Sequence, residues 1–221
     1  MNVMINPPGR RPMTLVFLSL LVFAGVLPAA APAAPEVKLK WTASGVLEKL
    51  GVPSRQPLTL SDAKPDSAKK TPDLKSPSFA ELKLGPRESP TTFIVVVDEP
   101  DGKPSRLFID ANHNGDLTDD PAPVWSEAKT PGPDGREVAL HEGSVTVRIP
   151  YPDGAREARL LFSRYDKNSD VPPAFRKFLF YSRDYAWIGD VKLGEKTYAA
   201  MLVDESTTGD FRGSAGKSSG V

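Results

Sequence analysis

A short acidic loop in the middle of the chain has the residue types and the spacing of a calcium site. Oxygen-bearing side chains occur at alternate positions, a glycine follows the third, and a leucine comes two residues later: Asp110, Asn112, Asn114, Gly115 and Leu117. Calcium takes about six to eight hard oxygen ligands. Alternate side chains in a tight loop can converge on one ion, and glycine permits the left-handed backbone that turns the chain around it. We therefore predict a calcium loop here, with the Asp116 carbonyl also pointing inward.

The second half of this loop departs from the calcium pattern. Pro121 occupies the position of the usual closing carboxylate, and Asp119 and Asp120 directly precede it. Either aspartate closes the shell if the backbone bends at the prolines. Pro121 and Pro123 forbid a helix after the loop, so we expect a strand-flanked loop rather than a helix–loop–helix sensor. The alternative is a polar turn without an ion, because Asn, Asp and Gly are also turn residues. The candidate metal ligands are Asp110, Asn112, Asn114, Asp116, Asp119 and Asp120.

A second segment near the C-terminus repeats this layout with weaker ligands. The corresponding residues are Asp204, Ser206, Thr208, Gly209, Asp210 and Phe211. Both loops follow a hairpin, which hints at an internal duplication. Hydroxyl groups are poorer calcium ligands than carboxylates, and the number of anionic ligands sets the affinity. A loop that keeps the turn without the ion is therefore favoured here, with calcium binding as the alternative.

The sequence offers little for catalysis. Its two histidines are His113, inside the first loop and expected to point outward, and His141, which is expected to precede a turn; nothing nearby suggests a catalytic triad. No phosphate-binding loop or dinucleotide fingerprint occurs. Paired carboxylates for glycoside hydrolysis stay open, because such pairs form in space rather than in sequence. Aromatic residues at strand spacing favour core packing, with a ligand groove as the alternative; they are Phe178, Phe180, Tyr181, Tyr185 and Trp187.

The composition excludes several classes of protein. The chain has 221 residues with 28 basic and 28 acidic side chains, so it has no electrostatic reason to bind nucleic acid. It has no cysteine, which excludes disulfides, thiolate metal sites and cysteine nucleophiles. The 23 prolines and 17 glycines indicate a fold rich in turns.

The N-terminus has the layout of a secretory signal. Two arginines precede an apolar stretch over residues 13–27, and Ala31-Pro32-Ala33 fits a cleavage site. The apolar stretch is shorter than the roughly 20 residues of a membrane-spanning helix, so cleavage is favoured over an uncleaved anchor. We expect a mature protein that begins at Ala34, is periplasmic or secreted, and has no membrane span.

The elements that position the two loops are predicted to be β-strands. Alternating or β-branched runs are bounded by turn dipeptides such as Asp101-Gly102, Asp134-Gly135 and Asp153-Gly154. The predicted strands cover residues 36–41, 79–84, 91–97, 106–109, 137–140, 144–151, 158–165, 178–181, 185–191 and 197–203. One short helical stretch is expected at residues 46–50. Short strands at this spacing predict an all-β fold, either an antiparallel sandwich or a barrel-like sheet.

The same pattern divides the chain into four parts. Residues 1–33 are the signal peptide, and residues 34–78 form an N-terminal segment and a linker. The linker, from residue 51 onward, is rich in Pro, Ser, Lys and Asp, a composition that buries too little apolar surface to fold. Residues 79–212 form the β domain, and residues 213–221 form a flexible Gly/Ser-rich tail.

The segment from Phe93 to Phe211 resembles a class of exported bacterial β-proteins. The resemblance rests on the ID-x-N-x-NGDLTDD loop, the RDYA segment and the LVDE-x-x-x-GDF loop. Members of this class carry EF-hand-like calcium loops, and some precede a thioredoxin-like redox domain. The resemblance implies calcium at Asp110, Asn112, Asn114 and Asp116, and more weakly at Asp204.

Three functional hypotheses follow. The first is a non-catalytic extracytoplasmic module that calcium stabilises at the first loop, with a structural or interaction role. The second is a secreted hydrolase or glycan-binding protein that uses an aromatic groove formed by Tyr181, Tyr185 or Trp187. The third is an accessory domain that binds another envelope protein through an exposed sheet edge.

Overall fold

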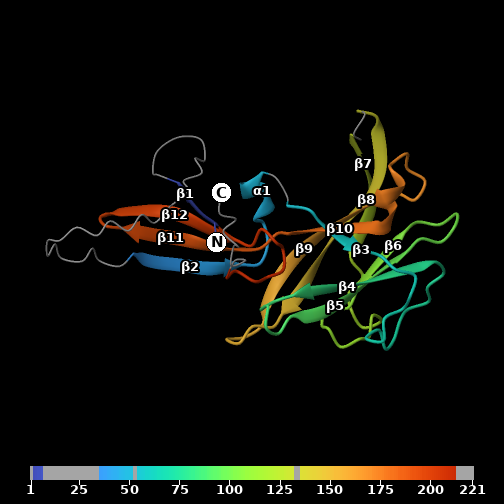
Figure 1. Cartoon of the computed structure of the whole chain (residues 1–221), viewed down its shortest axis with the longest axis horizontal. Coiled ribbons are helices and arrows are strands. Elements are labelled where there is room, and N and C mark those ends of the chain that lie inside the picture. The colour runs from blue at the N-terminus through green and yellow to red at the C-terminus, as the bar shows by residue number, and fades with distance from the viewer. Residues whose placement is uncertain (1, 7–34, 52–53, 132–134, 213–221) are drawn as a thin grey trace, which may run out of the picture. The chain divides into compact units, whose positions relative to one another are not determined.

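The computed structural model describes residues 2–6, 35–51, 54–131 and 135–212 (Figure 1). The chain folds as two compact units. Of the described residues, those within 43–185 and 205–210 form the larger unit, and residues 2–6, 35–42, 186–204 and 211–212 form the smaller unit. This division differs from the single β domain expected over residues 79–212, because strands from both ends of the chain pair with each other. The tail predicted at residues 213–221 lies outside the described residues.

The smaller unit is a four-stranded antiparallel sheet with the strand order β1-β12-β11-β2. Its strands are β1 (Asn2–Asn6), β2 (Glu36–Thr42), β11 (Ala186–Leu193) and β12 (Lys196–Val203). The Trp41 ring meets Trp187 and Phe211 edge to face, with ring centroids 5.6 and 5.7 Å apart. β1 belongs to the predicted signal, and residues 7–34, which contain its apolar stretch and cleavage site, lie outside the described residues. Among the described residues, no helix is long and apolar enough to cross a membrane.

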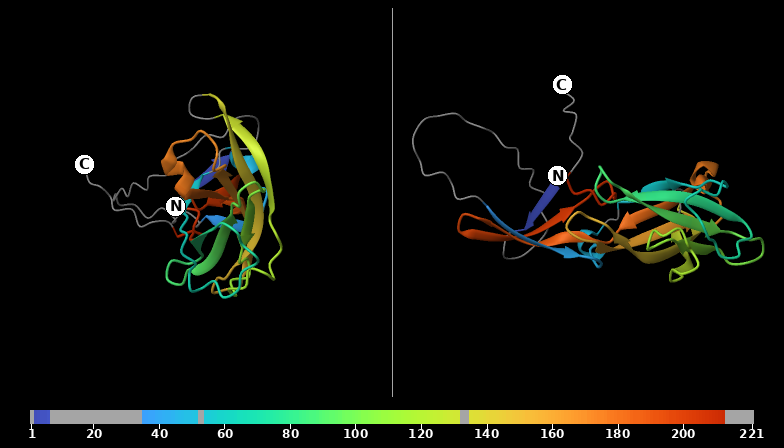
Figure 2. Two further views of the ribbon diagram at one scale, coloured as in Figure 1. Left: turned by 90° about the vertical axis from the view of Figure 1, so that its right-hand side faces the viewer. Right: turned by 90° about the horizontal axis from the view of Figure 1, so that it is seen from below.

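The larger unit consists of two antiparallel sheets in separate layers (Figure 2). The five-stranded sheet has the order β3-β10-β9-β8-β7, and the three-stranded sheet has the order β4-β5-β6. Their strands are β3 (Gln56–Thr59), β4 (Pro77–Leu84), β5 (Thr91–Asp98), β6 (Arg106–Ile109), β7 (Val124–Pro131), β8 (Glu137–Ile149), β9 (Arg156–Tyr165) and β10 (Phe178–Arg183). The prediction of an all-β fold is confirmed, in the form of a sandwich rather than a barrel.

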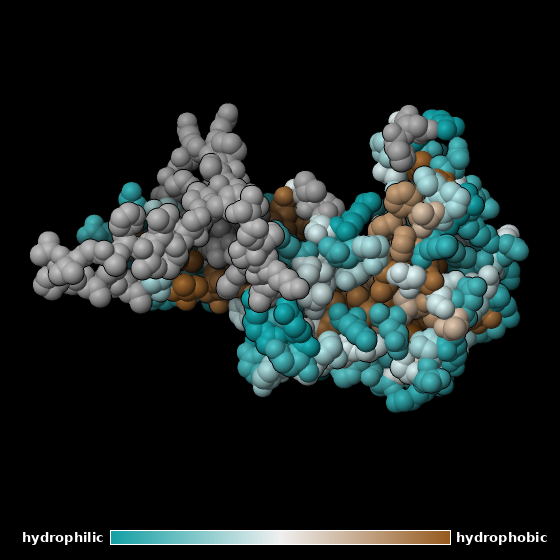
Figure 3. Space-filling view, in the orientation of Figure 1, coloured by the Kyte–Doolittle hydropathy of each residue, from teal (hydrophilic) through white to brown (hydrophobic). Residues whose placement is uncertain are grey.

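Alternation of buried and less buried residues explains how the five-stranded sheet contributes to the core. Along β9, Ala158, Leu160 and Phe162 are buried, and the residues between them are more exposed. Side chains alternate across a strand, so one face of β9 points into the sandwich. Val145 and Val147 of β8 lie opposite Leu160 and Ala158 and belong to the same face. On the outside, the face of this unit shown in Figure 3 is mostly hydrophilic, with some apolar side chains visible between the hydrophilic ones.

The three-stranded sheet is buried on both faces, which explains why the predicted linker is ordered. Phe79, Ile94, Val96 and Leu117 form a cluster on one face of this sheet, together with Ala68 from the segment before β4. That segment therefore covers the sheet and is not a linker. Its composition misled the prediction, because a few small apolar residues and backbone hydrogen bonds are enough to cover one sheet face. β3, which also lies in the predicted linker, pairs with β10.

A buried carboxylate fixes the end of this covering segment. Asp98 is fully buried at the end of β5 and accepts the backbone N–H groups of Lys75 (2.9 Å) and Ser76 (2.6 Å). It also pairs with Arg106. Burial alone would raise the pKa of Asp98, but these donors more than offset burial and hold the pKa below its usual value.

Most predicted strands are confirmed, and the differences have local causes. The expected pair 137–140 and 144–151 is one continuous strand, β8, because Gly143 does not interrupt the pairing with β9. β7, an edge strand with few apolar residues, had not been predicted. The predicted helix is the single turn α1 (Leu47–Leu50), and a 3-10 turn covers Pro173–Lys177. The Asp184 carboxylate accepts the N–H groups at the start of α1, at 2.7 and 2.8 Å.

Candidate functional site

The first loop follows β6 directly and turns around the carboxylate of Asp110. This residue is 1% exposed, and its backbone N–H donates to the Ile94 carbonyl at 2.9 Å, which anchors the loop to β5. Its carboxylate oxygens accept the backbone N–H groups of Asn114 (3.0 Å) and Gly115 (2.8 Å). Asp110 therefore shapes the loop from its first position, and its role as a calcium ligand stays a prediction.

Gly115 is required for two reasons. Its φ angle is +87°, and a Cβ atom there would lie 2.6 Å from the Ser67 carbonyl oxygen. The Gly115 carbonyl accepts the backbone N–H groups of Lys69 (2.9 Å) and Lys70 (3.0 Å). The glycine therefore bends the loop and also lets the covering segment pack against it. Leu117 is buried in the cluster beneath, as predicted.

His113 lies on the outer side of the loop, also with a left-handed backbone (φ 54°). The residue is exposed, as expected from its position in the pattern. Its ring nevertheless meets the buried ring of Phe93 edge to face, with centroids 5.9 Å apart. His113 thus packs on the loop from outside and does not take part in the polar centre.

Two asparagines and Asp119 close the loop on its exposed side. The Asn112 and Asn114 side-chain amides donate to the two Asp119 oxygens at 3.2 and 2.9 Å. Their own Oδ1 atoms accept the backbone N–H groups of Asn114 (3.0 Å) and Asp116 (2.6 Å). The amide nitrogens are the electropositive partners of Asp119. Its carboxylate therefore folds back over Asn112 and Asn114, although Asp119 comes two residues before the usual position of the closing carboxylate.

Asp120 is the least satisfied group of the loop. Burial, followed by the charge of Asp110, raises its pKa to about 6, although the backbone N–H groups of Ala111 and Asn112 bond to its carboxylate. Its Oδ2 atom is buried and has no hydrogen-bond partner among the described residues. A buried carboxylate oxygen without a donor is costly and is the kind of group that a cation satisfies.

Asp116 is the candidate ligand whose side chain lies apart from the others. Its carboxylate accepts the Thr118 backbone N–H (2.8 Å) and hydroxyl (2.5 Å), and it pairs with Lys70 at 2.9 Å. The Thr118 hydroxyl, then Lys70, lower the pKa of Asp116 to about 2. Only the backbone carbonyl of Asp116 is left for the role that the pattern gives this position.

A metal ion in the first loop would need amide as well as carboxylate ligands. In the described part of the chain, no group of three or more His, Cys, Asp or Glu side chains is arranged so that it can hold a metal ion. The loop instead combines the carboxylates of Asp110, Asp119 and Asp120 with the amides of Asn112 and Asn114. Carboxylate and amide oxygens are hard donors, which suit calcium and not a soft transition metal. In this structure the amide nitrogens, and not the oxygens, face Asp119.

The second loop has the same backbone bends with different partners. Its fourth and sixth positions, Thr207 and Gly209, have φ angles of 58° and 81°. The Thr208 carbonyl accepts the Gly85 backbone N–H at 2.6 Å, and the Gly209 carbonyl accepts the Tyr151 hydroxyl at 2.9 Å. Arg183 donates to the buried Thr207 hydroxyl at 3.3 Å. Groups of the protein therefore hold this loop.

The other side chains of the second loop make short-range contacts. The Ser206 and Thr208 hydroxyls lie 3.1 Å apart, and the Asp210 carboxylate lies 3.7 Å from Arg87. Asp204 and Asp210 are both buried. Calcium binding by this loop, the less favoured alternative from the sequence, stays a prediction.

His141 is the polar residue that the sequence interpretation placed wrongly. It does not precede a turn but lies inside β8, where it is 7% exposed. Its Nε2 atom lies 3.1 Å from an Asp166 oxygen, and its ring stacks on Trp125 with centroids 5.8 Å apart. These partners are distant in sequence, and Trp125 belongs to a strand that had not been predicted, so no local signal pointed to the cluster.

Two of the three rings expected to line an aromatic groove are buried, and the third, Trp187, is half-buried and meets Trp41 edge to face. Tyr185 is fully buried and Tyr181 is 8% exposed, so neither ring lines an open surface. Tyr181 packs against Phe162 in the sandwich core. These rings follow the more common outcome for aromatic residues at strand spacing, which is core packing.

Comparisons with protein-family models, with curated proteins and with solved structures found no match to this chain. The resemblance to exported calcium-loop proteins therefore stays a prediction.

Proposed function

We propose that this protein is an extracytoplasmic, non-catalytic β module whose first loop binds calcium in a structural role. The observation that carries the proposal is the buried Asp120 oxygen without a donor, next to the charge of Asp110. Calcium would neutralise the negative charge that Asp110, Asp119 and Asp120 bring to one loop. Oxygens of Asn112 and Asn114 would complete the ligand set.

The position of the loop explains why an ion there would be structural. Asp110 is bonded to β5, and Gly115 is bonded to the covering segment through Lys69 and Lys70. An ion held by this loop would therefore fasten β6 and the covering segment to the same point. Such an ion adds to stability by mass action, because it binds the folded chain and not the unfolded one.

The expected affinity is modest. The closing ligand would be Asp119 or Asp120, which precede the usual position of the closing carboxylate. Extracellular modules bind calcium with dissociation constants of about 10⁻⁴–10⁻³ M. At calcium concentrations of about 10 mM, ten to a hundred times these values, the stabilisation is about 1.4–2.7 kcal/mol. For a chain of this size, that corresponds to a rise in melting temperature of roughly 3–10 °C.

Thermal melting with and without calcium tests the proposal. We expect wild-type protein in 10 mM calcium to melt roughly 3–10 °C higher than in excess EDTA. Asp120→Asn should abolish this difference. Asp116→Asn is the matched control: it is the same substitution in the same loop, but its carboxylate bonds to Thr118 and Lys70, so the calcium response should persist. A wild-type melting temperature that EDTA leaves unchanged would remove the structural role.

The extracytoplasmic part of the proposal rests on the signal sequence. N-terminal sequencing of the protein recovered from a Gram-negative host should give a mature chain that begins at Ala34. Recovery of the intact N-terminus from the cytoplasm would contradict export, and it would leave the calcium proposal untouched because the loop is far from that segment in sequence.

A further inference from the structure

The inner face of the five-stranded sheet changes from apolar to polar along its strands, toward the C-terminal end of β9. Val145 pairs with Leu160 and Gly143 with Phe162, but the next pair on this face is His141 with Arg164. On β7, Glu127 lies opposite His141 and Trp125 lies opposite Gly143. The sandwich therefore ends in a polar region at this end of β7, β8 and β9, where a hydrophobic core would be the simpler way to add stability.

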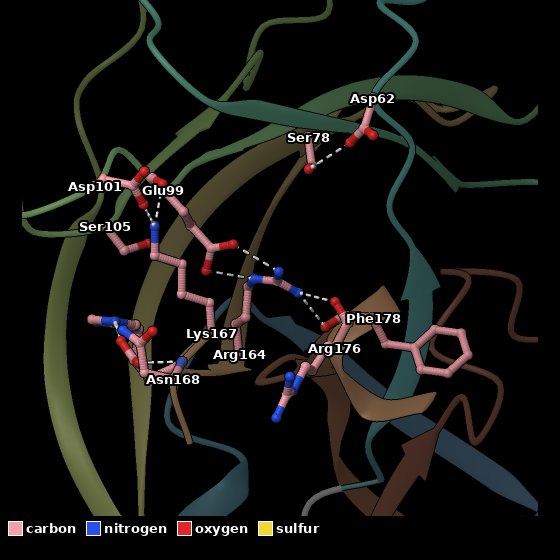
Figure 4. A network of polar contacts seen from close by, with 12 residues as sticks. Asp62, Ser78, Glu99, Asp101, Ser105, Arg164, Lys167, Asn168, Arg176 and Phe178 are labelled. Atoms are coloured by element: carbon pink, nitrogen blue, oxygen red, sulfur yellow. Dashed lines mark hydrogen bonds and ion pairs between the residues drawn. The ribbon is translucent and has the colours of Figure 1, made fainter. Parts of the chain in front are cut away.

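A buried ion pair organises this region (Figure 4). The Arg164 side chain is 7% exposed, and its guanidinium donates to both oxygens of Glu99 at 2.8 and 2.7 Å. It also donates to the carbonyls of Arg176 and Phe178 at 3.0 and 3.1 Å. Lys167 bonds to the Glu99 carbonyl (3.0 Å) and to an Asp101 oxygen (2.5 Å). The network holds its side chains in fixed positions.

Glu99 and Lys167 of this network line a cavity of about 540 Å³. The lining side chains that matter here are Glu99, Trp125, Glu127, His141, Asp166 and Lys167. Two of these charges are compensated inside the protein, Glu99 by Arg164 and Lys167 by Asp101, and Asp166 hydrogen-bonds to the His141 ring. Lys103 also lines the cavity. Among the described residues, Glu127 has no ion-pair partner. The cavity thus presents many hydrogen-bonding groups with little net charge.

Trp125 provides an apolar surface in the same cavity. Its indole nitrogen donates to the Ser105 hydroxyl at 3.2 Å, and one side of its ring stacks on His141 at an interplanar angle of 21°. A Cβ atom at Gly143 would lie 2.8 Å from the Trp125 ring, so this glycine makes room for the indole on the strand. With this side covered, the remaining surface of the ring is the one available to a ligand.

We propose that this cavity binds a neutral sugar ring of a glycan. The apolar face of a pyranose would stack on Trp125, and its hydroxyl groups would bond to Glu127, Asp166 and Lys167. Compensated charges favour a neutral ligand over an ion, and the polar lining favours hydroxyl groups over a hydrocarbon. The volume suits one or two sugar units. This binding site is separate from the calcium loop and does not depend on it.

Titration with defined oligosaccharides tests the inference. Full-length mature protein in EDTA would be titrated calorimetrically with cellotetraose, xylotetraose, maltotetraose, mannotetraose and chitotetraose, and with trigalacturonate as an acidic counterpart. We expect saturable binding of at least one neutral sugar and no binding of trigalacturonate. Absence of binding by every neutral sugar, or binding of the acidic one alone, overturns the proposal.

Variants tie the binding to this cavity. Trp125→Ala and Glu127→Gln should each weaken the affinity about tenfold or more. Glu127 is exposed, so its variant is expected to fold even if the tryptophan variant does not. Glu137→Gln, the same change at an exposed position of β8 that does not line the cavity, should bind like wild type. Unchanged affinity in Glu127→Gln, or an equal loss in Glu137→Gln, would overturn the assignment.

Discussion

The two loops share one backbone design and differ in how their charge is satisfied. Left-handed residues occupy the fourth and sixth positions of each, His113 and Gly115 in the first and Thr207 and Gly209 in the second. In both loops the glycine carbonyl accepts a hydrogen bond from a neighbouring segment. The likeness supports the duplication inferred from the sequence, because two unusual backbone angles recur at matching positions.

The difference lies in the side chains at the alternate positions. The first loop gathers Asp110, Asp119 and Asp120, and one Asp120 oxygen has no donor among the described residues. The second loop offers hydroxyl groups at two of these positions, and the protein supplies Arg183 and Arg87 as cationic partners. A loop of this shape can therefore be held by the protein alone. We expect an ion to be needed only where carboxylates accumulate beyond the available donors.

The largest expected effect comes from the two loop glycines. A Cβ atom at Gly115 would lie 2.6 Å from the Ser67 carbonyl oxygen, and one at Gly209 would lie 3.1 Å from Gly85 N and the Tyr151 hydroxyl. Both positions are left-handed, which costs alanine about 1–2 kcal/mol. Gly115→Ala should lower the free energy of unfolding by about 3 kcal/mol and Gly209→Ala by about 2 kcal/mol, measured by urea denaturation. A larger loss of stability in Gly209→Ala than in Gly115→Ala would contradict this comparison of the two loops.

A smaller effect, opposite in sign, is expected from one carboxylate. Because burial and Asp110 raise the pKa of Asp120 to about 6 from the ordinary 3.8, the calcium-free fold loses stability from this group as pH rises through that range. Asp120→Asn should therefore stabilise calcium-free protein at pH 7, by less than about 1 kcal/mol after solvent screening, and not at pH 4.

The second loop provides a control substitution for the Asp120→Asn measurement. Asp210→Asn removes a carboxylate that lies 3.7 Å from Arg87, so it should not stabilise the protein at pH 7. Urea denaturation of both variants in EDTA, at both pH values, makes the comparison. A destabilised Asp120→Asn variant at pH 7 would mean that the charge of the first loop is already satisfied by the protein.

The smallest expected effects come from the lysine and the arginine beside the loops. Lys70 is 64% exposed in its pair with Asp116, so Lys70→Gln should cost less than about 0.5 kcal/mol. It should also strengthen calcium binding about twofold at low salt, because it removes a positive charge near the ion. Arg87→Gln beside the second loop should leave calcium binding unchanged. Calorimetry at low salt measures both, and weaker binding in Lys70→Gln would contradict the placement of the ion.

Local patterns predicted much of the fold and of the first loop. The alternation along β9 and the β-branched run of β5 were sufficient to place these strands, and the glycine at position 115 was sufficient to predict the bend. Asp110 could be recognised as the first residue of the loop because its distance in sequence from Gly115 is a local property. The folding back of Asp119 onto the asparagines was left open, since it depends on the path of the chain at Pro121.

Features that depend on distant partners were not predictable from one sequence. Ala68 is buried because Phe79 and Ile94 leave one face of a sheet uncovered, and nothing near Ala68 in the sequence shows this. β7 pairs as an edge strand although its composition is mostly polar. The His141 cluster forms only once β7 and β8 are paired. In each case the decisive contact joins segments that local periodicity treats separately.

The number of calcium ions bound per chain tests the contrast between the loops most directly. Calorimetric titration of the mature protein should give one site per chain, which is lost in Asp120→Asn and retained in Asp204→Asn. Two sites, or one site that survives Asp120→Asn and disappears in Asp204→Asn, would contradict the account, as would the absence of any calcium binding.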